Sequence, residues 1–277
     1  METLKWLNDK GGMIDWRTHY SAAEAGDVEI LKWLQEIYCP ASEYAAKVAA
    51  RHGHLDALKW LKGNGYALDA DICSEAASGG HINILEFAHE NECPWSALAS
   101  FNSAEGGHIE TLKWLHANGC PWSQFVSASA AGQGRVDILQ FAHDNGLVRN
   151  ESCCRLAARG GQIEALRFLR STGDQFDVGT SGAASYNGEL DTLKWLHAEG
   201  CPLDGYVAIK AASAGHLHIL KWLHANDLVN ISATGLLSHE IMAFVRLAAV
   251  DTHNTEILEW LSTIDPASYC SSVSCVK

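Results

Sequence analysis

One short string of the sequence combines residue types that could do chemistry. Leu115 to Ser123 spell LHANGCPWS, in which His116 and Cys120 have the i, i+4 spacing of two metal or redox ligands. A structural zinc site needs four ligands, usually in paired short spacings. Here Gly119 lies between the two residues as a predicted helix end, so they need not share a helix face, and no second ligand pair accompanies them. We therefore predict no metal site and no cofactor.

The cysteines predict buried or loop thiols and no disulfide framework. Their number is nine, which is odd, and the chain is neither short nor visibly secreted, which favours a reduced, intracellular protein. Cys93 and Cys120 lie in neighbouring copies of the loop, and copies stacked about 10 Å apart would exceed the ~7 Å Cα limit for a disulfide. The vicinal pair Cys153 and Cys154 occupies predicted core positions and is expected to behave as small hydrophobic residues. Cys270 and Cys275 have no interpretation.

The loop string belongs to a period that organises the whole chain. GHIETLKWL at Gly107 has relatives such as GDVEILKWL at Gly26 and GHLHILKWL at Gly215, and neighbouring copies are 27 residues apart. The N-terminal ETLKWL fits as a half copy, and TEILEWL fits after an 11-residue insertion, which makes ten copies. A period of this length is typical of a solenoid of stacked supersecondary units.

Each copy predicts two helices. In the second helix, Ile109, Leu112, Trp114 and Leu115 form one apolar stripe, and the aromatic residue of that stripe recurs, which predicts a core ladder. A histidine ladder follows at the helix end, where imidazole donors suit unpaired carbonyls: His89, His116, His143, His197 and His224. A residue that can cap the first helix follows each loop: Asp15, Ser42, Asp69, Ser96, Ser123, Asn150, Asp177 and Asp204. Alanine pairs such as Ala76 and Ala77 then allow close helix packing.

The strings AASGGHINIL and AARGGQIEALRFL resemble the core of the ankyrin repeat. The period is 27 residues where that family usually has 33, and the missing residues fall where an ankyrin repeat places its β-hairpin finger. The resemblance implies an all-α solenoid of about ten helix pairs without fingers, protein binding and no enzymatic activity. The motif LKWLHANGCPW is similar to the repeats of giant DNA viruses and some protists, which would place the protein in a host cytoplasm.

Composition narrows the partner class. The net charge is −13, which argues against nucleic acid, and no run of 18 apolar residues could span a bilayer. We expect one solenoid over residues 1–265 and a tail over 266–277. Residues 226–252 break the period and are expected to be either a capping device or a binding element.

Positions that differ between copies predict the partner-binding face, since positions that stay alike hold the stack together. The differing positions recur at spacings of three and four along the first helix, hence on one face, and aromatic and arginine residues there are typical interface anchors. The alternative is that these residues vary between copies only because they are exposed and bind nothing, with Phe101 or Phe125 packed between copies. The candidates are Arg17, Tyr20, Tyr44, Lys47, Arg51, Phe101, Glu105, Phe125, Arg155, Arg159, Tyr186, Tyr206 and Lys210.

The sequence thus predicts a non-enzymatic scaffold for a protein partner, with no small-molecule substrate. Two alternatives stay open: a structural component that assembles with itself, for example in a viral particle, and an adaptor for ubiquitin-dependent degradation.

Overall fold

The computed structural model describes residues 1–147, 150, 152–226, 228 and 238–264. Within these ranges the regular elements are 19 α-helices, and no strand occurs among them, which confirms the all-α prediction. The first helices of the copies are α2 (Trp16–Glu24), α4 (Ala45–Arg51), α6 (Ala70–Gly79), α8 (Ala97–Glu105), α10 (Val126–Gly132), α12 (Ser152–Arg159), α14 (Val178–Asn187), α16 (Gly205–Ser213) and α18 (Ser238–Asp251). The second helices are α1 (Glu2–Asp9), α3 (Val28–Glu36), α5 (Leu55–Gly63), α7 (Ile82–Glu90), α9 (Ile109–Ala117), α11 (Val136–Asp144), α13 (Ile163–Ser171), α15 (Leu190–Ala198), α17 (Leu217–Ala225) and α19 (Thr255–Ile264).

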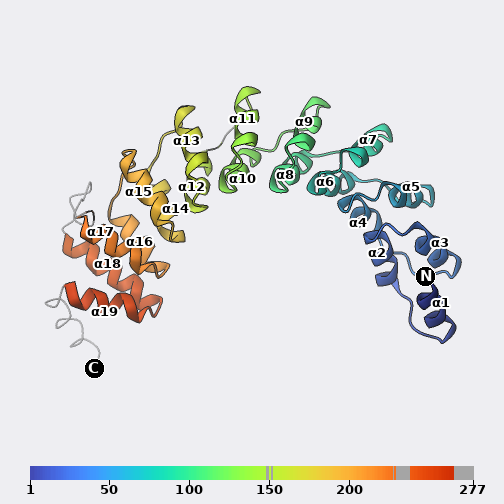
Figure 1. The fold of residues 1–277 in the computed structure, drawn as a ribbon, viewed down its shortest axis with the longest axis horizontal. Helices are drawn as coiled ribbons and strands as arrows, with labels where there is room; N and C mark the ends of the chain where they lie inside the picture. Colours follow the sequence, from blue (N-terminus) through green and yellow to red (C-terminus); the bar gives the residue numbers. More distant parts are fainter. Residues whose placement is uncertain (148–149, 151, 227, 229–237, 265–277) are drawn as a thin grey trace. The chain divides into compact units, whose positions relative to one another are not determined.

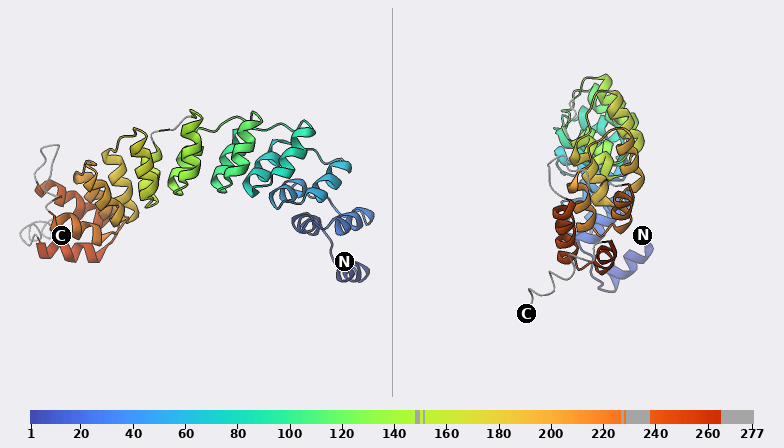
Figure 2. Two further views of the ribbon diagram at one scale, coloured as in Figure 1. Left: turned by 45° about the horizontal axis from the view of Figure 1, so that its top comes forward. Right: turned by 90° about the vertical axis from the view of Figure 1, so that its left-hand side faces the viewer.

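The helices pack by one rule in each of two compact units, Met1–Val126 and Ser127–Lys277. A first helix packs on its own second helix, as α14 does on α15, and on the first helix of the next copy, as α14 does on α16 (Figure 1). The same pairing can be followed from two other directions in Figure 2. Helices of 7–10 residues are too short to be stable alone, so this stacking is what stabilises them.

The helix starts follow the sequence prediction closely. All eight predicted capping residues accept a backbone N–H bond; the Asp69 carboxylate, for example, accepts from Asp71 N and Ile72 N. Ser42 and Ser123 accept such a bond too, although α4 and α10 begin three residues later. The predicted alanine pairs, such as Ala49 with Ala50 and Ala157 with Ala158, are fully buried between helices. Cys153 and Cys154 are buried as well.

A short loop stands where an ankyrin repeat has its finger. α9 ends at Ala117, and the Cys120 N–H donates to the carbonyl of Leu115, which folds the chain back at once. The Cys93 and Cys201 N–H groups make the equivalent bonds to Ala88 and Leu196. The connection therefore needs no strands, and the described loops contain none.

The predicted aromatic core ladder is confirmed only in part. Trp33 is buried, as predicted, but Trp114 is half-buried next to the fully buried Leu112 and Leu115, and Trp6 is largely exposed. At about 100° per residue, position 114 falls at the edge of the stripe that faces the first helix. Its ring instead meets the preceding copy, where it lies edge-on to His89 with the ring centroids 6.3 Å apart.

The histidine ladder is corrected in the same way. His143, His197 and His224 lie edge-on to Phe168, Trp222 and Trp260 of the next copy, at 5.8 to 6.2 Å between centroids. Where asparagine follows two residues later, as Asn145 follows His143 and Asn226 follows His224, its side chain donates to a helix-end carbonyl that we assigned to the imidazole. Asn118 Nδ2, for instance, donates to Trp114 O at 2.8 Å.

Two further predictions extend beyond the described residues. The tail 266–277, with Cys270 and Cys275, lies outside them, as do residues 227 and 229–237 of the predicted cap. The described part of that cap, α18, buries Ile241 and Val245 and exposes Phe244 and Leu247. One continuous solenoid over residues 1–265 and the capping role both stay predictions.

Candidate interaction surface

One position of the first helix carries large apolar side chains that remain exposed. It lies two residues after the capping residue, and its own N–H is the donor that the cap holds, as for Leu98 after Ser96. In the unit Met1–Val126 this position holds Tyr44, Leu98 and Phe125, which are 53%, 56% and 54% exposed, whereas Arg17 and Asp71 occupy it in the other two copies. The spacing of the three apolar residues is a multiple of the 27-residue period, so they occupy equivalent places at the starts of three first helices. We call this position the cap-plus-two slot.

In the unit Ser127–Lys277 the cap-plus-two slot is apolar only in part. Tyr206 fills it on α16 and is 44% exposed, whereas Gly179 leaves it empty on α14. Tyr186, one of the other predicted residues, is exposed near the end of α14. The Lys210 ammonium lies over both tyrosine rings, 5.5 Å from the centroid of Tyr186 and 5.0 Å from that of Tyr206.

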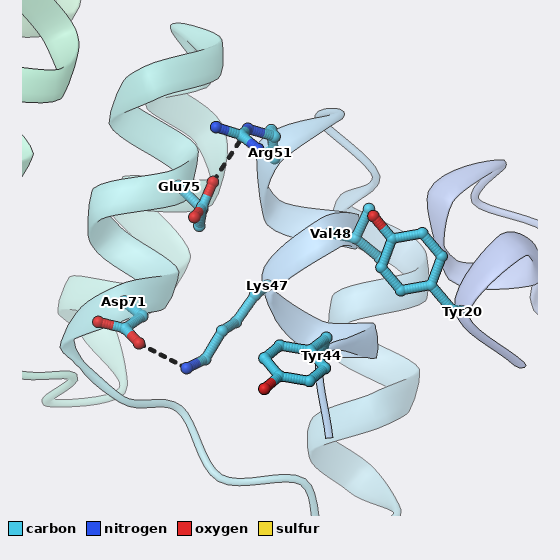
Figure 3. Close-up of a pocket in the computed structure, with 7 residues that line it drawn as sticks. All are labelled: Tyr20, Tyr44, Lys47, Val48, Arg51, Asp71 and Glu75. Atoms are coloured by element: carbon cyan, nitrogen blue, oxygen red, sulfur yellow. Dashed lines mark hydrogen bonds and ion pairs between the residues drawn. The ribbon is translucent and has the colours of Figure 1, made fainter. Parts of the chain in front are cut away.

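A hollow of about 280 Å³ opens beside Tyr44 on the first-helix face of α2, α4 and α6. Tyr20 and Tyr44 form one side, and two ion pairs between α4 and α6 form the other (Figure 3). The structure thus brings four predicted residues together in one place: Tyr20, Tyr44, Lys47 and Arg51.

The charges around this hollow are balanced within the chain. Lys47 Nζ lies 2.5 Å from Asp71 Oδ2 and 3.4 Å from Asp69 Oδ2. These carboxylates raise the pKa of Lys47, mainly through the hydrogen bond with Asp71. Arg51 Nε lies 3.0 Å from Glu75 Oε2. Lys47 and Arg51 therefore act as clamps between successive first helices, because each of these two cations meets an acid of the next copy.

The same clamp recurs in the second unit. Arg155 of α12 lies 2.6 Å from Asp177, which is also the capping residue of α14. The guanidinium, together with the capping bonds from Thr180, lowers the pKa of the Asp177 carboxyl to about 2. Arg155 thus pairs with the residue that caps the next first helix, α14.

The remaining predicted residues lie apart from the hollow. Arg17 is exposed, 4.0 Å from Asp15 and over the Trp16 ring. Phe101 is half-buried, whereas Glu105 and Arg159 are exposed. The first-helix face thus holds two kinds of residue, exposed apolar side chains and paired charges.

Sequence reasoning missed a family of bonds that joins the copies. In four copies a histidine follows the recurring glycine, and its Nε2 donates to a carbonyl 30 residues earlier at 2.8 to 3.1 Å; these are His54, His81, His108 and His216. The repeated Gly-His pair was visible in the sequence, but its acceptor lies in another copy and could not be found from spacing alone.

The loop cysteines also have a role that we did not assign. Cys39, Cys93, Cys120 and Cys201 each donate to the carbonyl of the capping residue 24 positions earlier, with Sγ to O distances of 3.0 to 3.6 Å. Burial raises the pKa of the Cys120 and Cys201 thiols, to about 11 for Cys120. These thiols tie each loop to the start of the first helix in their own copy.

In the described part of the chain, no group of three or more His, Cys, Asp or Glu side chains is arranged to hold a metal ion. None of the described helices is both long and apolar enough to cross a membrane.

Comparison with solved structures finds chains that are similar to this one. No protein-family model and no curated protein matches the chain. Among solved structures, the crystal structure of the human ASB11 ankyrin repeat domain is similar, with a TM-score of 0.48 and 19% sequence identity over 57% of this chain and 84% of that one. The described residues form the all-α helix pairs that the sequence resemblance to the ankyrin repeat predicts, and no strand stands where that repeat has its finger.

Proposed function

We propose that this chain is a non-enzymatic scaffold that binds a protein partner on its first-helix face. The observation that carries the proposal is the cap-plus-two slot of Met1–Val126. Tyr44, Leu98 and Phe125 are each more than half exposed at equivalent places on three helices. Exposed apolar residues scattered singly need no explanation, but their recurrence at one repeat position, interrupted by Asp71 between Tyr44 and Leu98, is typical of an interaction surface.

The setting of this row favours binding without rearrangement. The N–H of each of the three residues donates to the serine two positions earlier, and around Tyr44 the ion pairs Lys47–Asp71 and Arg51–Glu75 join α4 to α6. A surface that is already ordered loses little conformational entropy when it binds. The hollow beside Tyr44 is of a size to receive a side chain of the partner.

The charges indicate what kind of contact this face makes. Lys47 and Arg51 are already paired with acids of the next helix, so an acidic partner would have to compete with Asp71 and Glu75. We therefore propose that tyrosine and apolar side chains supply most of the binding energy, with the paired charges at the rim. Aromatic residues are the usual anchors of such interfaces.

The test compares three versions of the protein as bait in a crosslinked capture from cell extract. The first is the wild type, and the second carries Tyr44→Ser, Leu98→Ser and Phe125→Ser together. The third is a control, Tyr38→Asn, which removes a 93% exposed tyrosine from the loop between α3 and α4. Asparagine is chosen there because Tyr38 has a φ of 52°, in the left-handed region that asparagine tolerates.

We expect a stoichiometric partner that binds the wild type and the control equally and the triple variant at least about 30-fold more weakly, since removing even one anchor often costs 2 kcal/mol. A partner that binds the triple variant as well as the wild type would overturn the assignment of the face. If no foreign partner is captured and light scattering shows only self-association, the structural alternative replaces the scaffold. Capture of ubiquitin-ligase subunits would identify the degradation adaptor.

A further inference from the structure

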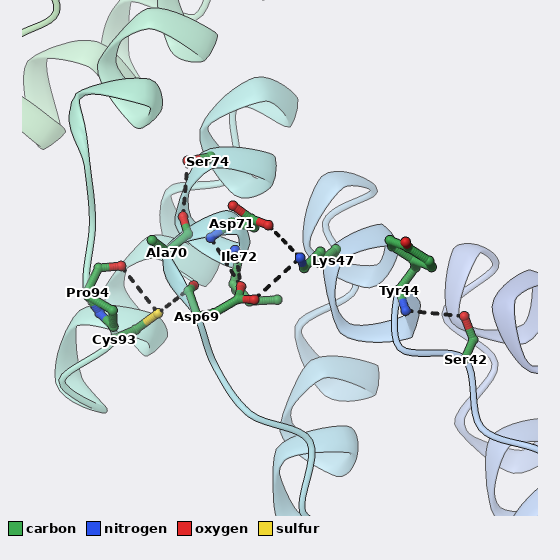
Figure 4. A network of polar contacts seen from close by, with 10 residues as sticks. All are labelled: Ser42, Tyr44, Lys47, Asp69, Ala70, Asp71, Ile72, Ser74, Cys93 and Pro94. Carbon is green, nitrogen blue, oxygen red and sulfur yellow. Dashed lines mark hydrogen bonds and ion pairs between the residues drawn. The ribbon is translucent and has the colours of Figure 1, made fainter.

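Two buried thiols face each other in the copy that contains α6 and α7. Cys73 lies on α6 and is fully buried, and Cys93 lies in the loop between α7 and α8 and is 6% exposed. Their Sγ atoms are 3.6 Å apart, and the Cys73 S–H donates to Cys93. Cys93 in turn donates to the carbonyl of Asp69, 3.0 Å away (Figure 4).

Sister copies show that the loop does not need this pair. The place of Cys73 is taken by Ser100 and Ser181, and the place of Cys93 by Cys120 and Cys201. Both serines donate to the carbonyl of the loop proline, Ser100 to Pro121 at 3.0 Å and Ser181 to Pro202 at 2.8 Å. A serine therefore serves the packing of this loop equally well, and Cys73 on α6 offers a chemistry that serine lacks.

We propose that Cys73 and Cys93 form a modification site, at which a small disulfide such as oxidised glutathione converts the two thiols into an intramolecular disulfide. The Cys93 thiolate attacks one sulfur of the small disulfide, forms a mixed disulfide and expels one small thiolate. The Cys73 thiolate then attacks Cys93 Sγ and expels the second. Two protein thiols lose two electrons and two protons, and the small disulfide is reduced to two thiols.

The surroundings assign the order of these two steps. The hydrogen bond from Cys73 stabilises the Cys93 thiolate and lowers the pKa of Cys93, and the same bond raises the pKa of Cys73. Cys93 also lies in a loop, whereas Cys73 is fixed within α6. Cys93 is therefore the attacking thiol, and a small opening of its loop is enough to expose it.

Closing the bond requires only a local movement. The sulfurs must approach from 3.6 Å to the ~2.05 Å of a disulfide, which rotation of the Cys93 side chain and a shift of its loop can provide. A disulfide sulfur has no proton to donate, so the bond to the Asp69 carbonyl is lost. The carboxylate of the same Asp69 caps α6 and pairs with Lys47, which lines the hollow on the first-helix face (Figure 4).

The test uses the folded, full-length protein and oxidised glutathione. After incubation, free thiols are alkylated in denaturant, and the protein is digested with trypsin. Peptide 63–113 contains Cys73 and Cys93 and no other cysteine, because no lysine or arginine lies between Lys62 and Lys113. We expect this peptide to lose two hydrogens and take up no alkyl group, and to regain two alkyl groups after reduction.

Other cysteines report whether the protein stayed folded during the reaction. Cys120, Cys154 and Cys201 fall in other tryptic peptides and should remain alkylated as in untreated protein. The matched variant is Cys73→Ser, which reproduces the residue of the sister copies. It should keep the circular dichroism spectrum of the wild type, and its Cys93 should end as a free thiol or as the glutathione mixed disulfide. The proposal is overturned if peptide 63–113 stays doubly alkylated under conditions that oxidise the denatured protein, or if Cys93 couples to Cys120 instead.

Discussion

The turn between α6 and α7 offers a direct test of how neighbouring copies are joined. Gly80 ends α6 with a φ of +76°, and a Cβ added there would lie 2.6 Å from Nδ1 of His108 in the next copy. The His108 ring cannot move away freely, because its Nε2 donates to Ser78 O at 3.1 Å. Gly119 offers the matched control, since it has a φ of +80° and nothing within 4 Å of an added Cβ.

The two glycine-to-alanine substitutions should therefore differ in cost. Alanine in the left-handed region costs roughly 1 kcal/mol, and we expect this cost alone for Gly119→Ala. Gly80→Ala adds about 1 kcal/mol for the displaced hydrogen bond and a similar amount for lost packing, or about 3 kcal/mol in total. For a unit of this size, 1 kcal/mol corresponds to about 4 °C in melting temperature.

The measurement is thermal and urea unfolding followed by circular dichroism, on both single variants, on His108→Ala and on the double variant Gly80→Ala with His108→Ala. The double-mutant cycle isolates the contact between the two residues. Once the ring is gone, Gly80→Ala should cost only about 1 kcal/mol, as Gly119→Ala does. Equal melting temperatures for the two glycine variants, or a Gly80→Ala cost unchanged by His108→Ala, would refute the role of this histidine in joining the copies.

Three further predictions concern caps and loops. Asp177 has a folded pKa of about 2, below its ordinary value, so its stabilising effect is present above about pH 4 and is lost as the pH falls toward 2. Because the pair with Arg155 is half exposed, Asp177→Asn should lower the free energy of unfolding by less than about 1 kcal/mol at pH 6. A difference in melting temperature that persists at pH 2 would contradict this. Glu92 has a φ of 54° at a loop position where sister copies carry glycine, so Glu92→Gly should raise stability by about 0.5–1 kcal/mol, and a lower urea midpoint would argue against strain there. Cys201→Ala removes a buried thiol and its bond to the Asp177 carbonyl, so it should cost about 1 kcal/mol in urea unfolding, and an unchanged midpoint would mean that the thiol does not hold the loop.

Local patterns were sufficient to predict the elements of this chain. Eight capping residues could be placed because a capping side chain accepts bonds from N–H groups only two or three residues further on, as Asp69 does from Asp71 and Ile72. The alanine pairs were placed by the period, since each repeats the environment of the last. The loop without a finger was predicted from the 27-residue period together with the resemblance to the longer ankyrin repeat.

The aromatic slot shows where local pattern stops being sufficient. Periodicity places Trp114 on the apolar side of its helix but does not distinguish the centre of the buried stripe from its edge. The distinction depends on where the neighbouring helices lie, and the stacking of copies turned this ring toward His89.

The sequence by itself determined the repeat, the helix pairs and the face that varies between copies, because these depend on residues close together in the chain. Only the tertiary structure decided what the varying residues do. Lys47, Arg51 and Arg155 looked like free cations, but each meets an acid between 22 and 24 residues further on. Cys73 and Cys93 looked like unrelated thiols until α6 and the following loop brought their sulfurs within 3.6 Å. The physical reason is the same in both cases: charge pairing and thiol contact depend on distances between copies, which the stacking of helices sets and the spacing within one copy does not contain.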